Sequence, residues 1–417
     1  MRLGIDFGTS NSASAVVTDD GQLVQIPLDG TSASMPTALF FSNEDGRVEY
    51  GSAAMRAYLS GEEGRLMRSI KSLLGSALMD EQTLVNGQPT TLFEIVVMFF
   101  KELKARSEAF LGRSVDAAML GRPVHFVDDD LARDRLAQAT LERAARAAGF
   151  TDVDFQLEPI AAAFDFERRV TQATTVLVVD IGGGTSDFTV VRVRPDSAAQ
   201  ADRTGDILAT TGIHIGGTDF DQLLNLRHVM PLLGLGHVGP SGREVPSAIF
   251  FNLATWHLIH QSYSRRSLHD AGELWQAYTN RALHARLMRV LQAREGHRIL
   301  SEVETAKIAC SNAGGAAVLD LDCIERGLAA TLTPQGLDEA LRDRLALIVD
   351  CARACVLAAG IQQPDVVYLT GGSSALAPLG AAFEAAFPGS DTVTGDRFGS
   401  VASGLATYGA RQGRAIA

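Results

Sequence analysis

The stretch Val176-Leu-Val-Val-Asp-Ile-Gly-Gly-Gly-Thr-Ser-Asp187 decides the fold that we predict for this chain. An apolar, β-branched run of this kind is typical of a buried strand. Its three glycines permit a tight hairpin whose backbone N–H groups face inward and can hold phosphate oxygens. Asp180 and Asp187 flank the glycines, and carboxylates beside phosphates hold Mg²⁺ directly or through water. Taken alone, the stretch also fits an ordinary Gly-rich hairpin.

A similar pattern opens the chain, where Ile5-Asp-Phe-Gly-Thr-Ser10 echoes Val179-Asp-Ile-Gly-Gly-Gly-Thr-Ser186. Each copy follows a strand pattern and carries an aspartate directly before the hairpin. Two such halves predict a duplicated α/β unit. Hairpins that face each other across a cleft would hold one polyphosphate from both sides, so the pair is far more specific than either copy.

The composition fits a globular protein with two or more domains: 417 residues, 46% hydrophobic and 21% charged. A net charge of −12 argues against nucleic acid or an anionic membrane as the main partner. The chain opens with a strand pattern and has no apolar run long enough to span a membrane, so we expect a cytoplasmic protein. None of the four cysteines forms a Cys-x-x-Cys pair; core packing is expected for Cys351 and Cys355, with a zinc site as the minor alternative.

Periodicity predicts an alternation of helices and strands along the whole chain. Helices are expected at 51–75, 91–111, 131–148, 160–166, 299–311, 337–359 and 401–410, and after 216–221 and 376. Strands are expected at 3–5, 13–17, 38–41, 117–127, 155–157, 176–180, 190–193, 207–215 and 366–370. The segment 231–296 is rich in Arg, His and aromatic residues and is expected to form a mostly helical lobe, and 170–173 to be a hinge.

A third Gly-rich stretch, Thr370-Gly-Gly-Ser-Ser374, follows the last predicted strand. With the two hairpins it resembles the phosphate-1, phosphate-2 and adenosine motifs of the superfamily of actin, sugar kinases and heat-shock ATPases. Within that superfamily the chain resembles the 70-kilodalton heat-shock chaperone (DnaK-like) family, in its short YegD-like branch. Six segments carry the resemblance in order: Gly4–Ser12, Ile70–Gly75, Glu158–Ala163, the Asp180 hairpin, Gly216–Asp221 and Val303–Lys307.

The resemblance implies an α/β, duplicated ribonuclease-H-like fold with two lobes of two subdomains around a nucleotide cleft. Lobe I would comprise residues 1–169 with subdomain IB inserted at about 40–115. Lobe II would comprise 170–417 with subdomain IIB inserted at about 216–300. Because the chain stops at Ala417, we expect no peptide-binding domain.

The resemblance also implies the role of each site residue. Asp6 and Asp180 would orient hydrated Mg²⁺, and Lys71, Glu158, Asp187 and Thr185 would be catalytic. The residues expected to bind ATP or ADP are Gly8, Thr9, Ser10, Asn11, Gly182, Gly183, Gly184, Gly216, Gly217, Glu304, Lys307, Gly371, Gly372 and Ser373. These parts suit phosphoryl transfer, which needs positioning, a metal, a cation on the γ-phosphate and a carboxylate for water. The chain has no Gly-x-x-x-x-Gly-Lys-[Ser/Thr] sequence, so a P-loop fold does not explain them.

Each role also has a simpler alternative. Lys71 fits a surface lysine, although it is one of only four lysines (Lys71, Lys101, Lys104 and Lys307) beside 33 arginines. Glu158 fits a helix cap, because an acid at a helix start is favourable in itself. Glu304 and Lys307 stand at i and i+3, the spacing of an ordinary helix-surface pair.

Two regions depart from the family pattern. Ala375 stands where a chaperone usually carries an arginine that stacks on adenine, and Ala402-Ser403-Gly404-Leu405 replaces Pro-Asp-Glu-Ala at the start of the last helix. Weaker or different binding of the base is therefore expected. The segment 226–298 is longer and less regular than in the family, and its Trp256 and neighbouring aromatic residues form either a partner surface or core.

The sequence thus predicts a slow, chaperone-like ATPase that binds Mg-ATP between two lobes. Lobe closure would act on a protein partner or co-chaperone not identified by the sequence, with no nucleic acid, no membrane and a monomeric state expected. The alternatives are a small-molecule (sugar) kinase of the same fold, in which Asp187 would serve as the base, and an actin-like filament ATPase.

Overall fold

Two five-stranded arrays of the same topology form the frame of the molecule. The computed structural model describes residues 1–127, 130–167, 170–195, 203–395 and 399–415. The first array runs in the order β11 (Asp152–Leu157), β10 (Ala117–Arg122), β1 (Arg2–Phe7), β2 (Asn11–Val17) and β3 (Leu23–Gln25), and β4 (Ser34–Pro36) adds to β2. The second runs β18 (Asp391–Thr394), β17 (Val366–Thr370), β12 (Thr174–Ile181), β13 (Ser186–Val193) and β14 (Ile207–Ile213).

The strand directions of the two arrays agree as well. In each array the strand that comes first in the sequence, β1 or β12, pairs antiparallel with the second, β2 or β13, and the second pairs antiparallel with the third, β3 or β14. The two later strands, β10 and β11 or β17 and β18, are added on the other side of the first strand by parallel pairing. The helices follow the same order: α2 (Leu92–Leu111), α3 (Leu131–Ala147) and α4 (Glu158–Glu167) in the first half, and α10 (Pro334–Ala358), α11 (Ala377–Ala386) and α12 (Ser400–Ala415) in the second. This agreement confirms the duplicated α/β fold.

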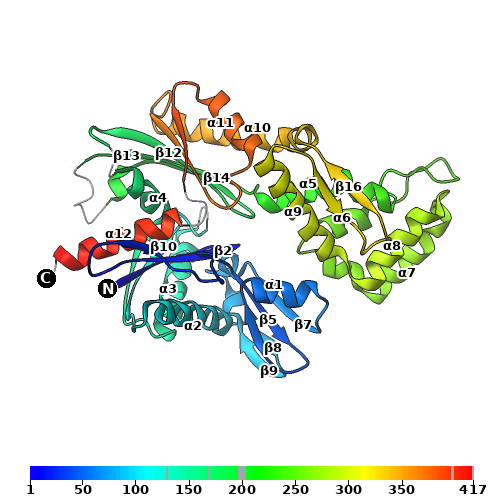
Figure 1. Cartoon of the computed structure of the whole chain (residues 1–417), viewed down its shortest axis with the longest axis horizontal. Helices are drawn as coiled ribbons and strands as arrows, with labels where there is room; N and C mark the ends of the chain where they lie inside the picture. The colour runs from blue at the N-terminus through cyan, green and yellow to red at the C-terminus, as the bar shows by residue number, and fades with distance from the viewer. Residues whose placement is uncertain (128–129, 168–169, 196–202, 396–398, 416–417) are drawn as a thin grey trace.

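The last helix of each half packs against the other half. Helix α12 lies on β1, β2 and β10, and α4 lies on β12 and β13. The contacts are tight: a β-carbon at Gly4 would lie 2.3 Å from the Ala406 nitrogen, and one at Gly404 only 1.9 Å from the Ala161 carbonyl oxygen. Small residues such as Gly4 and Gly404 let the two halves meet at their backbones. Figure 1 shows α12 lying along β10.

An insertion interrupts each half between the third strand and the next long helix. The first holds β5 (Ala38–Ser42), β6 (Val48–Tyr50), α1 (Ser52–Leu59), β7 (Gly64–Arg68), η1 (Ile70–Leu73), η2 (Ala77–Asp80), β8 (Gln82–Val85) and β9 (Gln88–Thr91). The second holds α5 (Gly217–His228), η5 (Met230–Leu233), α6 (Ala248–Ala254), η6 (Ile259–Tyr263), α7 (Arg265–Glu273), η7 (Leu274–Ala277), α8 (Arg281–Ala293), α9 (Gly296–Ala313), β15 (Ala317–Asp320) and β16 (Ala329–Leu332). In Figure 1 the two insertions lie on the same side of the paired sheets, one below the other.

Local sequence rules explain the helix ends that were predicted well. Helix α2 begins after Thr91, which forms a capping box with Glu94, and ends at Gly112 in the left-handed conformation with φ of 65°. The predicted 231–296 lobe is indeed mostly helical.

The prediction of a helix across 51–75 is wrong. Helix α1 ends at Leu59, the chain turns at Gly61 with φ of 83°, and β7 then pairs antiparallel with β5. Tertiary pairing overrides the helical composition of this stretch.

The predicted domain limits are not tested by these observations. Residues 168–169, at the expected boundary between the lobes, lie outside the described residues. No helix within the described ranges is long and apolar enough to cross a membrane.

Candidate active site

The loops of the two hairpins meet each other. The loop between β1 and β2 carries Ser10, and a β-carbon at Gly183, between β12 and β13, would lie 2.1 Å from the Ser10 Oγ. A β-carbon at Gly8 would lie 2.1 Å from the Asn11 carbonyl oxygen. At Gly8 the obstacle is backbone, so glycine is needed there for the loop to keep its shape. A β-carbon at Gly183 would require the Ser10 side chain to rotate away. Thr9 and Asn11 flank Ser10 in the first loop and at the start of β2.

Thr37 holds the first loop in place through two hydrogen bonds. Its hydroxyl donates to the Gly8 carbonyl oxygen at 2.8 Å, and its backbone N–H donates to the Ser10 carbonyl oxygen at 2.9 Å. Two bonds from one residue hold both ends of this short loop. The sequence analysis did not single out Thr37, since it lies outside the recognised motif.

The second loop is fastened by the start of α5 and by the third Gly-rich stretch. The Gly217 N–H donates to the Gly182 carbonyl oxygen at 3.0 Å, and the Thr218 N–H donates to that of Gly183 at 2.7 Å. The Ser373 hydroxyl donates to the Gly182 carbonyl oxygen at 3.2 Å. The structure thus brings together the three Gly-rich motifs from distant parts of the chain. A β-carbon at Gly216 would lie 2.6 Å from the Gly184 nitrogen, so this contact also needs glycine.

Gly371 makes room for Asp180. It has φ of 87°, a conformation that side chains disfavour, and a β-carbon there would lie 2.3 Å from Asp180 Oδ1. Gly372 follows and is exposed. The parallel pairing of β12 with β17 places Asp180 opposite Thr370, directly before this turn.

Lys71 and Glu158 form a largely buried ion pair. The Lys71 Nζ lies 2.8 Å from Glu158 Oε1, and each side chain is only 12% exposed. Lys71 stands on the short helix η1, which begins after Ser69, a residue in the left-handed conformation with φ of 58°. Gly121 in β10 leaves space for Glu158, because a β-carbon there would lie 3.1 Å from its Cγ.

Three carboxylates, those of Glu158, Asp6 and Asp180, act on this single ammonium group. Burial, together with the negative charge of Glu158, raises the pKa of Asp6 to about 7. Burial and the charges of Glu158, Asp187 and Asp6 raise the pKa of Asp180 to about 8. Burial opposes the charge of Lys71, yet the carboxylates of Glu158, Asp6 and Asp180 together raise its pKa. The site therefore holds an excess of negative charge in a desolvated space.

Asp187 and Thr185 belong to the edge of this cluster. The Thr185 hydroxyl donates to Asp187 Oδ2 at 3.0 Å. Both residues are exposed, in contrast to Asp6 and Asp180. Asp187 is thus positioned by its neighbour in a part of the site that water can reach.

Lys307 lies apart from the carboxylate cluster. It is 5% exposed, and its Nζ lies 2.7 Å from Asp221 Oδ1 on α5 and 3.4 Å from the Gly217 carbonyl oxygen. Burial raises the pKa of Asp221 to about 6, with the Lys307 charge opposing that rise. Glu304, one turn earlier on α9, is exposed. Asp221 was quoted in a motif but not predicted as a site residue; its buried pairing with Lys307 shows that it orients α9 against the second loop.

A cavity of about 680 Å³ borders the cluster. Glu158, Asp180, Asp187 and Thr370 line one side of it, and apolar residues including Pro159 line another. Within the described parts of the chain, no three His, Cys, Asp or Glu side chains converge as a direct metal-ligand set. That Asp6 and Asp180 orient hydrated Mg²⁺ stays a prediction.

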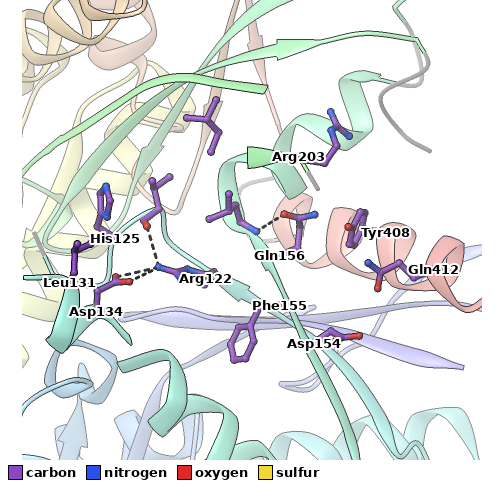
Figure 2. Close-up of a pocket in the computed structure, with 13 residues that line it drawn as sticks. Arg122, His125, Leu131, Asp134, Asp154, Phe155, Gln156, Arg203, Tyr408 and Gln412 are labelled. Atoms are coloured by element: carbon purple, nitrogen blue, oxygen red, sulfur yellow. Dashed lines mark hydrogen bonds and ion pairs between the residues drawn. The ribbon is translucent and has the colours of Figure 1, made fainter. Parts of the chain in front are cut away.

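A second hollow of about 710 Å³ lies beside β11 and α12 (Figure 2). One of its cations, Arg122, is paired with Asp134, with Nη2 2.9 Å from Oδ2, and the side-chain Oε1 of Gln156 accepts from the Leu157 N–H at 2.8 Å. Figure 2 shows Arg122 and Asp134 pointing toward each other rather than into the hollow. None of the predicted site residues lines this hollow, whereas Glu158, Asp180 and Asp187 line the cavity beside the carboxylate cluster.

Comparison with known families agrees with this geometry. The family model described as Hsp70 protein matches residues 2–231, which include both hairpins, Lys71, Glu158 and the start of α5. This chain belongs to the Hsp70 family. Its Hsp70 relationship implies the actin-like ATPase fold, as the duplicated sheets show.

One Hsp70 relative is the "Chaperone protein DnaK" of Endomicrobium trichonymphae, which is 32% identical over 228 residues. The alignment covers 53% of this chain and 34% of the relative, so the chain matches about a third of the relative's length. Glu304, Lys307 and the Gly371 loop lie outside the stretch that the Hsp70 model matches. The roles of the site residues, inside that stretch as well as outside it, stay predictions.

Proposed function

We propose that this Hsp70-family chain binds Mg-ATP between its two halves, hydrolyses it slowly, and changes lobe closure to act on a protein partner. The observation that carries the proposal is the meeting of two Gly-rich hairpins over a buried Lys71–Glu158 pair flanked by Asp6 and Asp180. Phosphoryl transfer depends on such fixed charges more than on covalent chemistry.

The residues present suit Mg²⁺ and a phosphate chain. The donors are carboxylate oxygens, which are the ligands that Mg²⁺ prefers. The ammonium group of Lys71 is placed to balance the charge of Asp6, Glu158 and Asp180. Gly184 faces open space, since a β-carbon there would meet no atom within 4 Å, and a cradle for phosphate oxygens requires such room. Bound Mg²⁺ would supply further positive charge along the phosphates.

Each residue of the site would then have a separate role in the proposed hydrolysis. Lys71, held by Glu158, presents a fixed positive charge where negative charge develops on the transferred phosphoryl group. Asp187, which Thr185 holds and which remains exposed, orients the attacking water and accepts its proton. Glu158 keeps Lys71 in place and shares in positioning that water. Gly371, Gly372 and Ser373 approach the inner phosphate and ribose, with Glu304 and Lys307 at the base end.

We also propose that the protein acts as a monomer in the cytoplasm. All four cysteines are free, as expected for a reducing compartment. The protein partner would sense the relative position of the two halves. Family membership supports a partner of the co-chaperone or client class.

Calorimetry with ATP, in Mg²⁺ and in EDTA, tests the binding step, and single-turnover hydrolysis tests the chemistry. We expect Mg²⁺-dependent binding and slow release of phosphate. The double variant Asp6→Asn with Asp180→Asn should lose the difference between Mg²⁺ and EDTA. Tight ATP binding in EDTA, or wild-type Mg²⁺ dependence in the double variant, would contradict the assignment.

The cavity beside Asp187 favours one second candidate, a small-molecule kinase. Its volume of about 680 Å³ is enough for a hydroxylated acceptor next to a carboxylate base. A panel of sugars separates the two functions. ADP release that depends on one sugar would establish the kinase, whereas basal hydrolysis that no sugar accelerates supports the ATPase.

A further inference from the structure

The two insertions touch each other through four side chains that we call the clasp: Tyr58, Arg68, Trp256 and His297. Tyr58 and Arg68 come from the first insertion, on α1 and β7. Trp256 follows α6, and His297 stands in the first turn of α9, both in the second insertion. The clasp therefore joins the two halves at a place far from their crossing helices.

The hydrogen bonds of the clasp fix the proton on His297. Its Nε2 lies 3.0 Å from the Trp256 carbonyl oxygen, which can only accept, so Nε2 carries the proton. Its Nδ1 lies 2.8 Å from the Tyr58 hydroxyl and must accept from it. A neutral His297 thus links Tyr58 of one half to Trp256 of the other in a single chain of hydrogen bonds.

Ring contacts reinforce these bonds. The Tyr58 and His297 rings meet edge-on with centroids 5.1 Å apart, and the Trp256 and His297 rings with centroids 4.7 Å apart. The Arg68 guanidinium carbon lies 4.5 Å from the centre of the Trp256 ring, a cation–π geometry. His297 is only 7% exposed, so water does not replace these contacts while the halves are closed.

Arg68 is held by the second half in another way as well. Burial lowers its pKa, and the charges of Glu304 on α9 and Asp221 on α5 oppose that fall. These are the elements that carry Lys307 and fasten the second loop. Separation of the halves would break the stack on Trp256 and remove both carboxylates from the guanidinium.

Arg68 is also connected directly to the candidate catalytic lysine. Only Ser69 and Ile70 separate it from Lys71; Ser69 is fixed in a left-handed turn and Ile70 is buried. Lys71 in turn contacts Glu158 at 2.8 Å. A displacement of Arg68 would therefore be transmitted to Lys71 through these two residues, because both are held in place.

We propose that the clasp holds the cleft closed and that Arg68, as a positioning residue, makes the placement of Lys71 depend on closure. The clasp must open for a ligand to enter or leave. The identity of that ligand rests on the function proposed above, but the contact between the halves does not.

The first test measures the release of a fluorescent ADP analogue by stopped flow. Loss of a desolvated cation–π contact in Arg68→Ala or Trp256→Ala should speed release roughly 10- to 30-fold. Tyr58→Phe, which loses one hydrogen bond, should speed it about fivefold. Arg68→Lys keeps a cation over the ring and should fall between wild type and Arg68→Ala.

A second Arg–Trp pair in the chain is a matched control for the cation–π contact between Arg68 and Trp256. Arg281 lies over Trp275 at the same 4.5 Å, but both residues belong to the second insertion. Arg281→Ala should release the analogue at the wild-type rate. Wild-type release by folded Arg68→Ala and Tyr58→Phe proteins, or equal acceleration by Arg281→Ala, would overturn the clasp.

A second readout tests the link to Lys71. In single-turnover hydrolysis of bound ATP, Arg68→Ala should be about tenfold slower than wild type, with recovery in Arg68→Lys. Trp256→Ala leaves Arg68 without its stacking partner and should slow hydrolysis in the same direction. Unchanged hydrolysis in Arg68→Ala would remove its positioning role.

A third readout needs no nucleotide, so it separates failure of the clasp from failure of the proposed function. The chain has two tryptophans, and Trp275→Phe leaves Trp256 as the only one. In this background, Arg68→Ala and Tyr58→Phe should expose Trp256 to acrylamide quenching, while Arg281→Ala should not. If wild type binds no ADP analogue, the proposed function fails, and equal quenching in all variants overturns the clasp.

Discussion

The ammonium group of Lys71 lies 2.8 Å from the carboxylate of Glu158, although the two residues belong to different structural units. Lys71 comes from the first insertion, and Glu158 begins α4, the helix that crosses to the second half. Their pairing joins the first insertion to the start of α4. Asp6 and Asp180, one from each sheet, act on the same ammonium group.

Replacement of Lys71 by alanine tests whether this charge acts in catalysis. Lys71→Ala should leave Mg-ATP binding largely intact and slow single-turnover hydrolysis at least about 100-fold, because a fixed charge is lost where charge develops. Lys101→Ala is the control, since Lys101 is exposed on α2. Unchanged hydrolysis in Lys71→Ala would remove the catalytic role.

Gly184 offers a test of the phosphate cradle that does not disturb the fold. A β-carbon there would meet no atom within 4 Å, so Gly184→Ala should unfold at the same denaturant concentration as wild type. If the second loop wraps phosphates, the added methyl group should weaken ATP binding at least about tenfold.

Gly380→Ala is the matched control for this prediction. Its β-carbon also meets no atom within 4 Å, but Gly380 lies in α11, away from the loops. ATP affinity should be unchanged, with a small gain in stability from the helical alanine. Equal ATP affinity in Gly184→Ala and Gly380→Ala would argue against the cradle.

The parts of the site predicted from sequence are those encoded in short motifs. The two hairpins, Lys71 and Glu158 each lie in a recognisable segment, and the duplicated sheets follow from the repeated Asp-x-Gly pattern. The helix predicted across 51–75 failed because the pairing of β7 with β5 depends on residues outside that stretch. Local composition carries no information about such a partner.

The clasp could not be predicted from the sequence, for the same reason. Tyr58 and His297 are 239 residues apart, and neither stands in a motif. Trp256 was noticed as a possible surface or core residue, but its contact with Arg68 depends on how the two halves close. Asp221 was visible in the Gly216–Asp221 motif, yet only burial beside Lys307 reveals what it does.

An arginine at position 375 should strengthen binding of the adenine base. Ala375 lies on the loop after Gly371, where its carbonyl oxygen is 3.4 Å from the Ser311 hydroxyl of α9. Ala375→Arg should tighten ATP and ADP binding by up to about tenfold through stacking on adenine. Calorimetry with inorganic tripolyphosphate is the control and should show no change. A gain for tripolyphosphate would indicate a general charge effect instead of base stacking.

His297 should make lobe opening sensitive to acid. Its burial lowers its pKa from an ordinary value of 6.5 to about 4 in the closed structure. The Tyr58 hydroxyl on α1 bonds its Nδ1, and Arg68 on β7 and His260 on η6 act on it by charge. Nearby, the Tyr263 hydroxyl on η6 accepts from the N–H of Gly296, and Glu295 stands two residues before His297. A protonated His297 cannot accept the Tyr58 hydrogen bond, so protonation favours the open form.

The sign of the effect follows from proton linkage. Between pH 6.5 and pH 4 the open form binds a proton that the closed form excludes, so closure weakens as the pH falls and is unaffected above pH 7. Release of the fluorescent ADP analogue should be roughly 20-fold faster at pH 5 than at pH 7. His297→Gln cannot be protonated and should flatten this dependence. The same acid acceleration in His297→Gln as in wild type would assign the pH response to another group.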